Sequence, residues 1–409
     1  MELLVEQKRL GPHSFLACVL VIGILMIMPI DLYVPALPVM QAELGVSASL
    51  LNLTMFAFFF CSAFAVVLAG PLSDRYGRRP LLVVSCVLLL VSSAGCALSP
   101  NIWVLIVCRI IQAFAYGFEM TVQTALIRDA YGGKDLKLAM TLVQSLIIIG
   151  PALAPFLGSF LIVFFDWRGV FWCLAAMGAV CTVLALMLSE TYPAGRRKAG
   201  KVVQSLAGTF RHVQALASDK MFLSFALILG FAGVPYFAWI ATVSYDLLDF
   251  FHMDYLGYSI CYAITCVMTV LAPYAYMFLS KRCSIQWILC FSFLMFLVTL
   301  LLLAFFGTAS ALLFTIAFLP FTLGEGIVRP MSYVVMMQQP PERVGAASTV
   351  ANFAYSVMTS LATVVATLPW TNFIFGLTVI LGASLAVMAL LYLWGVRKAD
   401  FSYVESEEG

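Results

Sequence analysis

Five ionisable side chains lie inside stretches of the sequence that are otherwise apolar. They are Asp31, Arg109, Glu119, Glu325 and Arg329. A charged side chain in a bilayer is costly unless it is paired, protonated or placed in a wet cavity. These residues therefore predict proton or ion chemistry inside a membrane.

Asp31 and Arg109 are predicted neighbours. If their stretches form helices of opposite direction, Asp31 lies about six residues and Arg109 about eight residues below the outer ends, so their depths agree within a few Å. Burial disfavours a charged carboxylate and a guanidinium favours it, which leaves a group able to switch protonation. We predict that Asp31 couples protons and that Arg109 tunes it. A permanently ionised structural pair is the alternative.

Glu119 shares its stretch with other polar residues at helical spacing, namely Arg109, Gln112, Tyr116 and Gln123. At 100° per residue these side chains fall within about a quarter-turn of one helix face. Such a stripe lines a wet cavity or packs on polar partners. Glu119 is either a second proton site or an anchor for a cationic substrate. Glu325 and Arg329 stand four residues apart, so mutual neutralisation explains them as well as a function does.

Membrane-spanning helices must position these residues, because 63% of the chain is hydrophobic and only 10% is charged. Twelve apolar stretches are each about the 20 residues that a spanning helix needs. They cover residues 14–36, 48–70, 80–99, 102–125, 138–163, 169–189, 221–243, 256–279, 285–306, 309–333, 344–367 and 372–395. The first is too long for a signal-peptide core, so we expect it to be retained.

The basic residues predict the orientation. With both termini in the cytoplasm, 19 of the 22 Lys and Arg residues fall on the cytoplasmic side, Arg109 and Arg329 fall inside helices, and only Arg168 lies outside. The polar stretch 190–220 separates two six-helix halves. We expect an N-terminal bundle (1–189), a cytoplasmic linker (190–220), a C-terminal bundle (221–395) and a cytoplasmic tail (396–409).

Several function classes find no support in the sequence. The eleven Cys lie almost all in apolar stretches without a C-x-x-C pair, and the chain has only three His, so we expect no metal site. There is no phosphate loop for an ATP-driven pump. The net charge of +2 follows from the orientation and does not call for nucleic acid. We expect neither an enzyme nor a cofactor.

The loop after the second stretch reads "GPLSDRYGRRP". Here the chain resembles the major facilitator superfamily, in particular its twelve-helix drug:proton antiporter branch, through the pattern G-x-x-x-D-[RK]-x-G-R-[RK]. The residues of the pattern are Gly70, Asp74, Arg75, Gly77, Arg78 and Arg79. The resemblance implies two six-helix bundles with inverted repeats and transport by alternating access.

Three further stretches strengthen the resemblance. "RIIQAFAYG" is similar to a helix 4 pattern that keeps Arg109 and Gln112, with Ala113 in place of a usual Gly. "GPALAPFLG" resembles the antiporter motif, carried by Gly150, Pro151, Pro155 and Gly158. "DLYVPALP", "DWRGVFW" and "SETYP" resemble the bicyclomycin and chloramphenicol resistance subgroup.

The resemblance also implies roles. Asp74 and Arg78 are expected to form a gating cluster with Asp129, and Asp74 can also face a helix N-terminus near Gly345. The antiporter motif is expected to bend its helix and to seal the site against proton leak. Close packing alone would explain its glycines and prolines almost as well.

Aromatic residues near bends or near the polar stripe suit a pocket for lipophilic molecules. As substrate-binding residues we predict Tyr33, Gln112, Tyr116, Glu119, Tyr236 and Trp239.

The sequence thus predicts proton-coupled efflux of lipophilic drug-like molecules by a monomer in a bacterial plasma membrane. Its partners are a small-molecule substrate, protons and membrane lipid. The alternative is a dedicated exporter or importer of one metabolite, such as an amino acid, a sugar or a siderophore. A channel remains a third reading.

Overall fold

The computed structural model describes residues 3–5, 7, 10–192, 216, 218–397 and 401. All regular structure in these residues is helical, so the predicted all-α class is confirmed. The chain divides into two compact units, Met1–Ala207 and Gly208–Gly409. Most of the predicted linker 190–220 and of the tail 396–409 lies outside the described residues.

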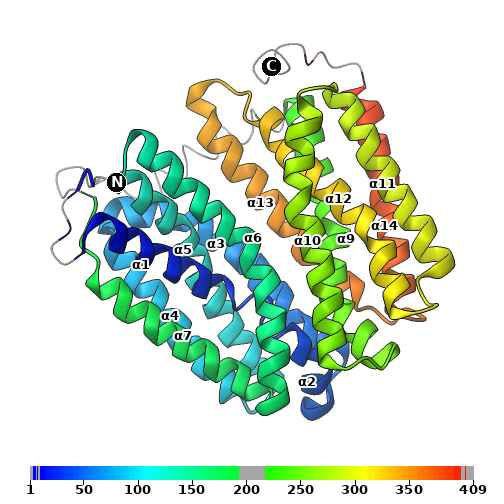
Figure 1. The fold of residues 1–409 in the computed structure, drawn as a ribbon, viewed down its shortest axis with the longest axis horizontal. Helices are drawn as coiled ribbons and strands as arrows, with labels where there is room; N and C mark the ends of the chain where they lie inside the picture. Colours follow the sequence, from blue (N-terminus) through cyan, green and yellow to red (C-terminus); the bar gives the residue numbers. More distant parts are fainter. Residues whose placement is uncertain are drawn as a thin grey trace. The chain divides into compact units, whose positions relative to one another are not determined.

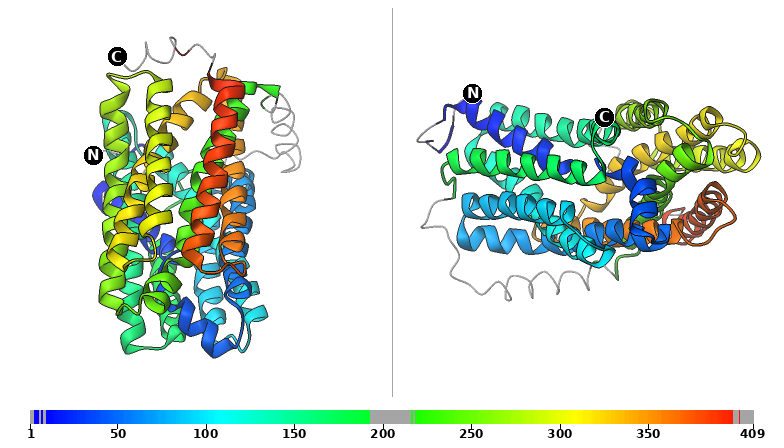
Figure 2. Two further views of the ribbon diagram at one scale, coloured as in Figure 1. Left: turned by 90° about the vertical axis from the view of Figure 1, so that its right-hand side faces the viewer. Right: turned by 90° about the horizontal axis from the view of Figure 1, so that it is seen from below.

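Unit 1 is a bundle in which the helices lie side by side (Figures 1 and 2). Its elements are α1 (Pro12–Ile27), η1 (Val34–Ala36), α2 (Leu37–Leu44), α3 (Ala48–Tyr76), α4 (Arg78–Ala97), α5 (Ile102–Ala130), α6 (Gly133–Phe164) and α7 (Trp167–Met187). α5 packs against α3 and α4, α4 also packs against α7, and α1 contacts α5, α6 and α7. α5 therefore has helices on several sides, which buries its polar stripe.

Unit 2 is a second bundle of long helices. Its elements are α9 (Lys220–Ser244), the π-helical turn η3 (Tyr245–Phe250), α10 (Tyr255–Ser280), α11 (Ile285–Phe306), α12 (Ala311–Met336), α13 (Pro341–Ala366), α14 (Phe373–Leu391) and η4 (Tyr392–Val396). α9 packs against α13, α14 and α12, and α12 also packs against α10 and α11.

Polar side chains fix the starts of most of these helices. An Asn, Asp or Ser before the helix accepts a hydrogen bond from a backbone N–H of the first turn and so satisfies a donor that the helix leaves open. These capping residues are Ser47, Asn101, Asp166, Asp219, Asp254, Ser284, Ser310 and Asn372.

Ten of the described helices are long and apolar enough to cross a membrane, and two shorter apolar helices, Pro12–Ile27 and Leu153–Phe164, accompany them. Large apolar side chains point outward from them; Trp287 and Phe305 are 73% and 75% exposed. A surface of this kind suits lipid rather than water. Several helices extend beyond the predicted apolar stretches, and α5 continues to Ala130.

Candidate functional site

The first apolar stretch is not one helix. α1 ends at Ile27, and residues 28–33 form consecutive turns before η1. Pro29 and Pro35 explain the break, because each lacks a backbone N–H and a proline ring clashes with the preceding turn of an α-helix. The predicted helix over 14–36 is therefore wrong in this part. Asp31 lies in the break and is buried, and a discontinuous helix leaves carbonyl groups free to bind other partners.

Arg109 of α5 is attached to this break. Its Nη1 donates one hydrogen bond to the carbonyl oxygen of Pro29 at 2.9 Å and another to Oε1 of Gln112 at 2.7 Å. The amide of Gln112 in turn donates to the hydroxyl of Ser93 on α4 at 2.7 Å. Arg109 is thus attached to Pro29, which lies two residues before Asp31 in the sequence. A direct contact between the side chains of Arg109 and Asp31 stays a prediction.

Aromatic rings cover the Arg109 guanidinium. Its central carbon lies 4.3 Å from the ring centre of Tyr33 and 4.5 Å from that of Phe58. The Tyr33 hydroxyl is hydrogen-bonded to that of Thr54 at 3.1 Å, and Tyr33 is fully buried. Cation–π contacts stabilise a desolvated charge by about 2 kcal/mol or more. Tyr33 therefore positions Arg109 here.

The polar stripe of α5 divides into two kinds of residue. Arg109, Gln112 and Gln123 pack on polar partners; the amide of Gln123 donates to the carbonyl of Val19 on α1 at 3.0 Å. Glu119 differs, because it is only 3% exposed and its Oε1 has no hydrogen-bond partner among the described residues. A buried carboxyl oxygen of this kind disfavours the charged form of the group.

The stretch "GPALAPFLG" brings α6 against the break. A Cβ atom at Gly158 would lie 2.0 Å from the carbonyl oxygen of Leu32, and one at Gly150 would lie 2.5 Å from Cγ2 of Ile27. Only glycine permits this approach. Pro155 is buried, whereas the side chain of Pro151 lies outside the described residues. The motif thus contacts the residues on either side of Asp31.

The structure brings together Asp74, Arg78 and Asp129. Nη1 of Arg78 lies 2.8 Å from Oδ1 of Asp74, and Nε lies 3.2 Å from Oδ2 of Asp129. Arg78 also donates to the hydroxyl of Ser73. Between α3 and α4, Gly77 has a φ of 103°, which favours glycine. The expected approach of Asp74 to the helix near Gly345 joins the two units and stays a prediction.

The predicted loop is helical except at Gly77, because α3 continues to Tyr76 and α4 starts at Arg78. The other residues of the motif are less connected. Arg79 donates to the carbonyl of Leu186 at 2.9 Å, Arg75 lies over the ring of Tyr76, and Gly70 has open space where a side chain would stand.

Sequence reasoning missed two partners of Arg78. Glu190 accepts hydrogen bonds from the backbone N–H of Arg78 and of Tyr192, both at 3.0 Å. The Tyr192 ring centre lies 4.6 Å from the Arg78 guanidinium. Both residues belong to "SETYP", so this stretch joins the chain after α7 to the start of α4.

In unit 2, Trp239 stands in an aromatic cluster. Its ring stacks on Phe318 at 5.2 Å and lies 5.0 Å from Tyr262 and 6.2 Å from Tyr236. Trp239 is buried, and its Nε1 has no hydrogen-bond partner among the described residues. A bound molecule with an acceptor group could satisfy this donor.

Glu325 and Arg329 do pair. The Arg329 guanidinium donates to Oε1 of Glu325 from Nε at 3.0 Å and from Nη2 at 2.5 Å, and Nη2 also donates to the Tyr355 hydroxyl at 2.5 Å. The Glu325 side chain is 1% exposed, whereas that of Arg329 is 40% exposed. Glu325 and Arg329 therefore neutralise each other's charge within α12.

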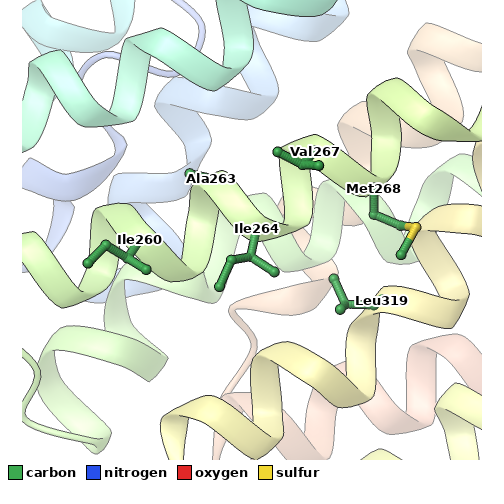
Figure 3. Close-up of a pocket in the computed structure, with 6 residues that line it drawn as sticks. All are labelled: Ile260, Ala263, Ile264, Val267, Met268 and Leu319. Atoms are coloured by element: carbon green, nitrogen blue, oxygen red, sulfur yellow. The ribbon is translucent and has the colours of Figure 1, made fainter.

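An apolar cavity of about 380 Å³ lies between α10 and α12 (Figure 3). Its lining consists of Ile260, Ala263, Ile264, Val267, Met268 and Leu319. It holds no predicted site residue and no polar side chain that could orient a ligand.

The stretch "DWRGVFW" ties the start of α7 to the end of α2. Glu43 accepts a hydrogen bond from Arg168 and one from Nε1 of Trp167, the latter at 2.8 Å. The Arg168 hydrogen bond, the desolvation that opposes it and the Trp167 bond together lower the pKa of Glu43 below its ordinary value of 4.5. Asp166 caps α7 by accepting from the N–H of Gly169 at 2.9 Å.

No group of three or more His, Cys, Asp or Glu side chains within the described parts of the chain is arranged to hold a metal ion.

Known proteins resemble this chain along most of its length. The model of the Major Facilitator Superfamily matches residues 19–363. An uncharacterized MFS-type transporter, YdgK of Bacillus subtilis (strain 168), is 30% identical over 261 residues, which are 63% of each chain. Multidrug resistance protein MdtL of Escherichia coli O17:K52:H18 (strain UMN026 / ExPEC) is 30% identical over 188 residues, 46% of this chain and 48% of that protein. The chain thus spans about half to three fifths of the length of these curated relatives.

Solved structures share the fold. A D-xylose-proton symporter has a TM-score of 0.75 at 15% identity, covering 93% of this chain and 97% of that chain. A bacterial homolog of the human lysosomal transporter Spinster has a TM-score of 0.74 at 15% identity, covering 96% and 98%. At such identities the likeness concerns the fold alone. With the family model matched over most of its helices, this chain belongs to the Major Facilitator Superfamily.

Proposed function

We propose that this chain is a secondary transporter that exports lipophilic, drug-like small molecules in exchange for protons, within the bicyclomycin and chloramphenicol resistance-like subgroup of the drug:proton antiporters. It acts as a monomer in the bacterial plasma membrane with both termini in the cytoplasm. The similarity to MdtL, a protein named for multidrug resistance, supports the substrate class.

One observation carries the proposal. Two buried carboxyl groups, Asp31 and Glu119, stand in the same helix bundle, one in a break of the first helix and one on α5 with an oxygen that lacks a hydrogen-bond partner among the described residues. Such groups bind protons readily, because the charged form is disfavoured in an apolar interior. Each proton that crosses inward contributes about 2.3 kcal/mol per 100 mV of membrane potential.

Arg109 makes the proton exchange sensitive to movement of the break in the first helix. Its guanidinium holds the Pro29 carbonyl next to Asp31, so a movement of the break changes the distance between the positive charge and the carboxyl group. A nearer guanidinium favours release of the proton and a more distant one favours its uptake. Arg109 therefore acts as the tuning residue, and Glu119 is the second proton site.

Aromatic and amide side chains supply the substrate pocket. The proposed substrate-binding residues of unit 1 are Tyr33, Gln112, Tyr116 and Glu119, and those of unit 2 are Tyr236 and Trp239. Few directional contacts and many ring faces allow broad selectivity for lipophilic molecules. The close packing of Gly150 and Gly158 against the break supports a seal against proton leak in this region.

The cluster of Asp74, Arg78 and Asp129 gates the cytoplasmic side. Its ion pairs join the end of α3 and the start of α4 to the end of α5. An ion pair that forms in one state and breaks in another biases the equilibrium between those states. Gly70, Arg75, Gly77 and Arg79 shape and orient the same junction between α3 and α4.

Proton release from the purified protein in detergent tests the proposal. Chloramphenicol or a lipophilic cation is added to the wild type, Asp31→Asn, Glu119→Gln and the exposed-acid control Asp249→Asn. We expect release from the wild type and from the control, and loss in Asp31→Asn. Release that is unchanged in Asp31→Asn would show that Asp31 does not carry the exchanged proton.

No release from the wild type with any lipophilic compound would favour a dedicated transporter of one metabolite. Saturable, gradient-dependent counterflow in proteoliposomes excludes a channel.

A further inference from the structure

A second buried carboxyl site stands in unit 2, outside the machinery described so far. Asp246 lies on η3, where α9 widens into a π-helical turn, and it is 2% exposed. The N–H of Phe251 reaches back five residues to the carbonyl of Asp246 at 3.0 Å. π-Helical turns are rare in proteins, and those that occur frequently lie at functional sites. This turn directs an acidic side chain into the bundle, whereas its neighbour Asp249 is exposed.

The elements packed against η3 offer Asp246 no cation. They are α9, α10 and α14. α10 and α14 contain no Lys, Arg, His, Asp or Glu, and the only charged residue of α9 is Lys220 at its opposite end. At 1.5 Å per residue, Lys220 stands about 39 Å away along the helix. His252 follows η3 but is exposed beside Asp249.

The other titratable side chains on these elements are neutral at ordinary pH. They are Tyr236 on α9, Tyr245 on η3, and Tyr255, Tyr258, Cys261, Tyr262, Cys266, Tyr274 and Tyr276 on α10. A carboxylate at Asp246 would therefore be a buried charge without a counter-ion from α9, α10 or α14. Such a group takes up a proton instead.

The surroundings of Asp246 leave its carboxyl group poorly hydrogen-bonded. Oδ2 has no hydrogen-bond partner among the described residues. The Thr242 hydroxyl, one turn earlier, is hydrogen-bonded to the Asp246 side chain and also lies 3.2 Å from the carbonyl oxygen of Ala238, to which it can donate. A hydroxyl has a single hydrogen, so Thr242 cannot donate to both groups at once.

We propose that Asp246 is a proton-binding site of unit 2, separate from Asp31 and Glu119, which loads from the outer side of the membrane. The apolar span Lys220–Phe250 ends four residues beyond Asp246, or about 6 Å along the helix. The distribution of basic residues directs this end outward. The inference rests on the proposed function only for the use of the proton in transport, because the protonation itself follows from the surroundings of Asp246.

Infrared difference spectroscopy of the purified full-length protein in lipid nanodiscs at neutral pH tests this site. Wild type, Asp246→Asn and the matched control Asp249→Asn are compared in H₂O and D₂O. We expect a protonated-carboxyl C=O band that shifts in D₂O and that loses the intensity of one carboxyl group in Asp246→Asn only. Thr242→Val keeps the carboxyl group and should shift the frequency of this band, which provides a second readout if Asp246→Asn does not fold.

Equal band intensity in wild type and Asp246→Asn would overturn the proposal, because Asp246 would then be ionised. If only Thr242→Val can be prepared, an unshifted band has the same meaning. Loss of the band when choline chloride is replaced by sodium chloride would identify a sodium site instead of a proton site. Wild-type protein that keeps the Asp246 band but releases no protons with any drug would contradict the proposed function and leave this inference intact.

Discussion

At the scale of single residues, burial alone does not distinguish the carboxyl groups of unit 1. Asp31 and Glu119 are both buried, but Arg109 is attached to the backbone beside Asp31, whereas an oxygen of Glu119 has no hydrogen-bond partner among the described residues. An arginine nearby keeps a carboxylate available for exchange, and an apolar site holds a carboxylic acid. In the proposed proton exchange, the two groups would therefore serve different steps.

Replacing Glu119 with Gln should reduce the drug-induced proton release. It should change the free energy of unfolding by about 1 kcal/mol or less, because no hydrogen bond to Oε1 is lost. Gln123→Ala on the same helix is the contrast. It removes the bond to Val19 and the amide that fills the space beside Gly23, and should cost about 1–3 kcal/mol. Thermal unfolding in detergent measures both, and a large loss of stability in Glu119→Gln would reveal a structural role instead.

The spacing of the α5 stripe was sufficient to predict one polar face, because helix periodicity is a local property. The partners of that face could not be predicted. Arg109 binds a carbonyl that is available only where the first helix breaks, and Gln123 binds a carbonyl of α1. Two prolines on either side of an aspartate were the available signal for the break.

At the scale of the elements, α6 packs closely against the broken first helix through Gly150 and Gly158. We call this contact the seam. Gly158→Ala would place a Cβ at 2.0 Å from the Leu32 carbonyl oxygen, so one of the two segments must move. We expect a cost of about 1–3 kcal/mol and weaker proton coupling.

Gly382→Ala on α14 is the matched control for that substitution, because its Cβ would meet Leu300 at an ordinary 3.5 Å. The control should be neutral or stabilising by up to about 1 kcal/mol. Thermal unfolding of the two variants makes the comparison, and equal effects would refute the close packing of the seam.

The contact between α2 and α7 should depend on pH. The folded pKa of Glu43 is lowered, so its stabilisation is present above the unfolded pKa and is lost as the pH falls through the folded pKa. Glu43 and Arg168 are 45% and 31% exposed, which limits the ion pair to about 0.2–1 kcal/mol. Glu43→Gln should lower the unfolding temperature near neutral pH and have no effect in strong acid. An equal loss at every pH would contradict the titration of Glu43.

Apolar stretches predicted the existence of the helices better than their ends. Hydropathy reports the hydrocarbon region, whereas α3 continues beyond its predicted stretch to Tyr76 and α6 begins before its predicted stretch, at Gly133. Both extensions carry charged residues, such as Arg75 and Asp135. The π-helical turn at Tyr245–Phe250 lies just beyond the predicted apolar stretch 221–243 and contains two aspartates. A single widened turn of six residues is too short to give a periodic signal of its own.

At the scale of the whole molecule, the distribution of basic residues sets a testable topology. Cys283 is exposed in the loop between α10 and α11, which the orientation places in the cytoplasm. In a variant that keeps only this cysteine, a membrane-impermeant thiol reagent should label intact cells weakly and permeabilised cells strongly.

Ala309→Cys in a background without cysteines is the control for this labelling, because Ala309 is exposed in the loop between α11 and α12. It should react in intact cells. Labelling of Cys283 in intact cells would reverse the orientation and with it the side from which Asp246 takes its proton.

The broken first helix also bears on how the protein is made. α1 has 16 residues, a length of about 24 Å against a hydrocarbon core of about 30 Å. As the nascent chain leaves the ribosome, this segment reaches the bilayer with Asp31 and two helix-breaking prolines at its far end, before Arg109 or Gly158 has been synthesised. We therefore expect α5 and α6 to assist the stable insertion of the first helix, because Arg109 and Gly158 contact its break.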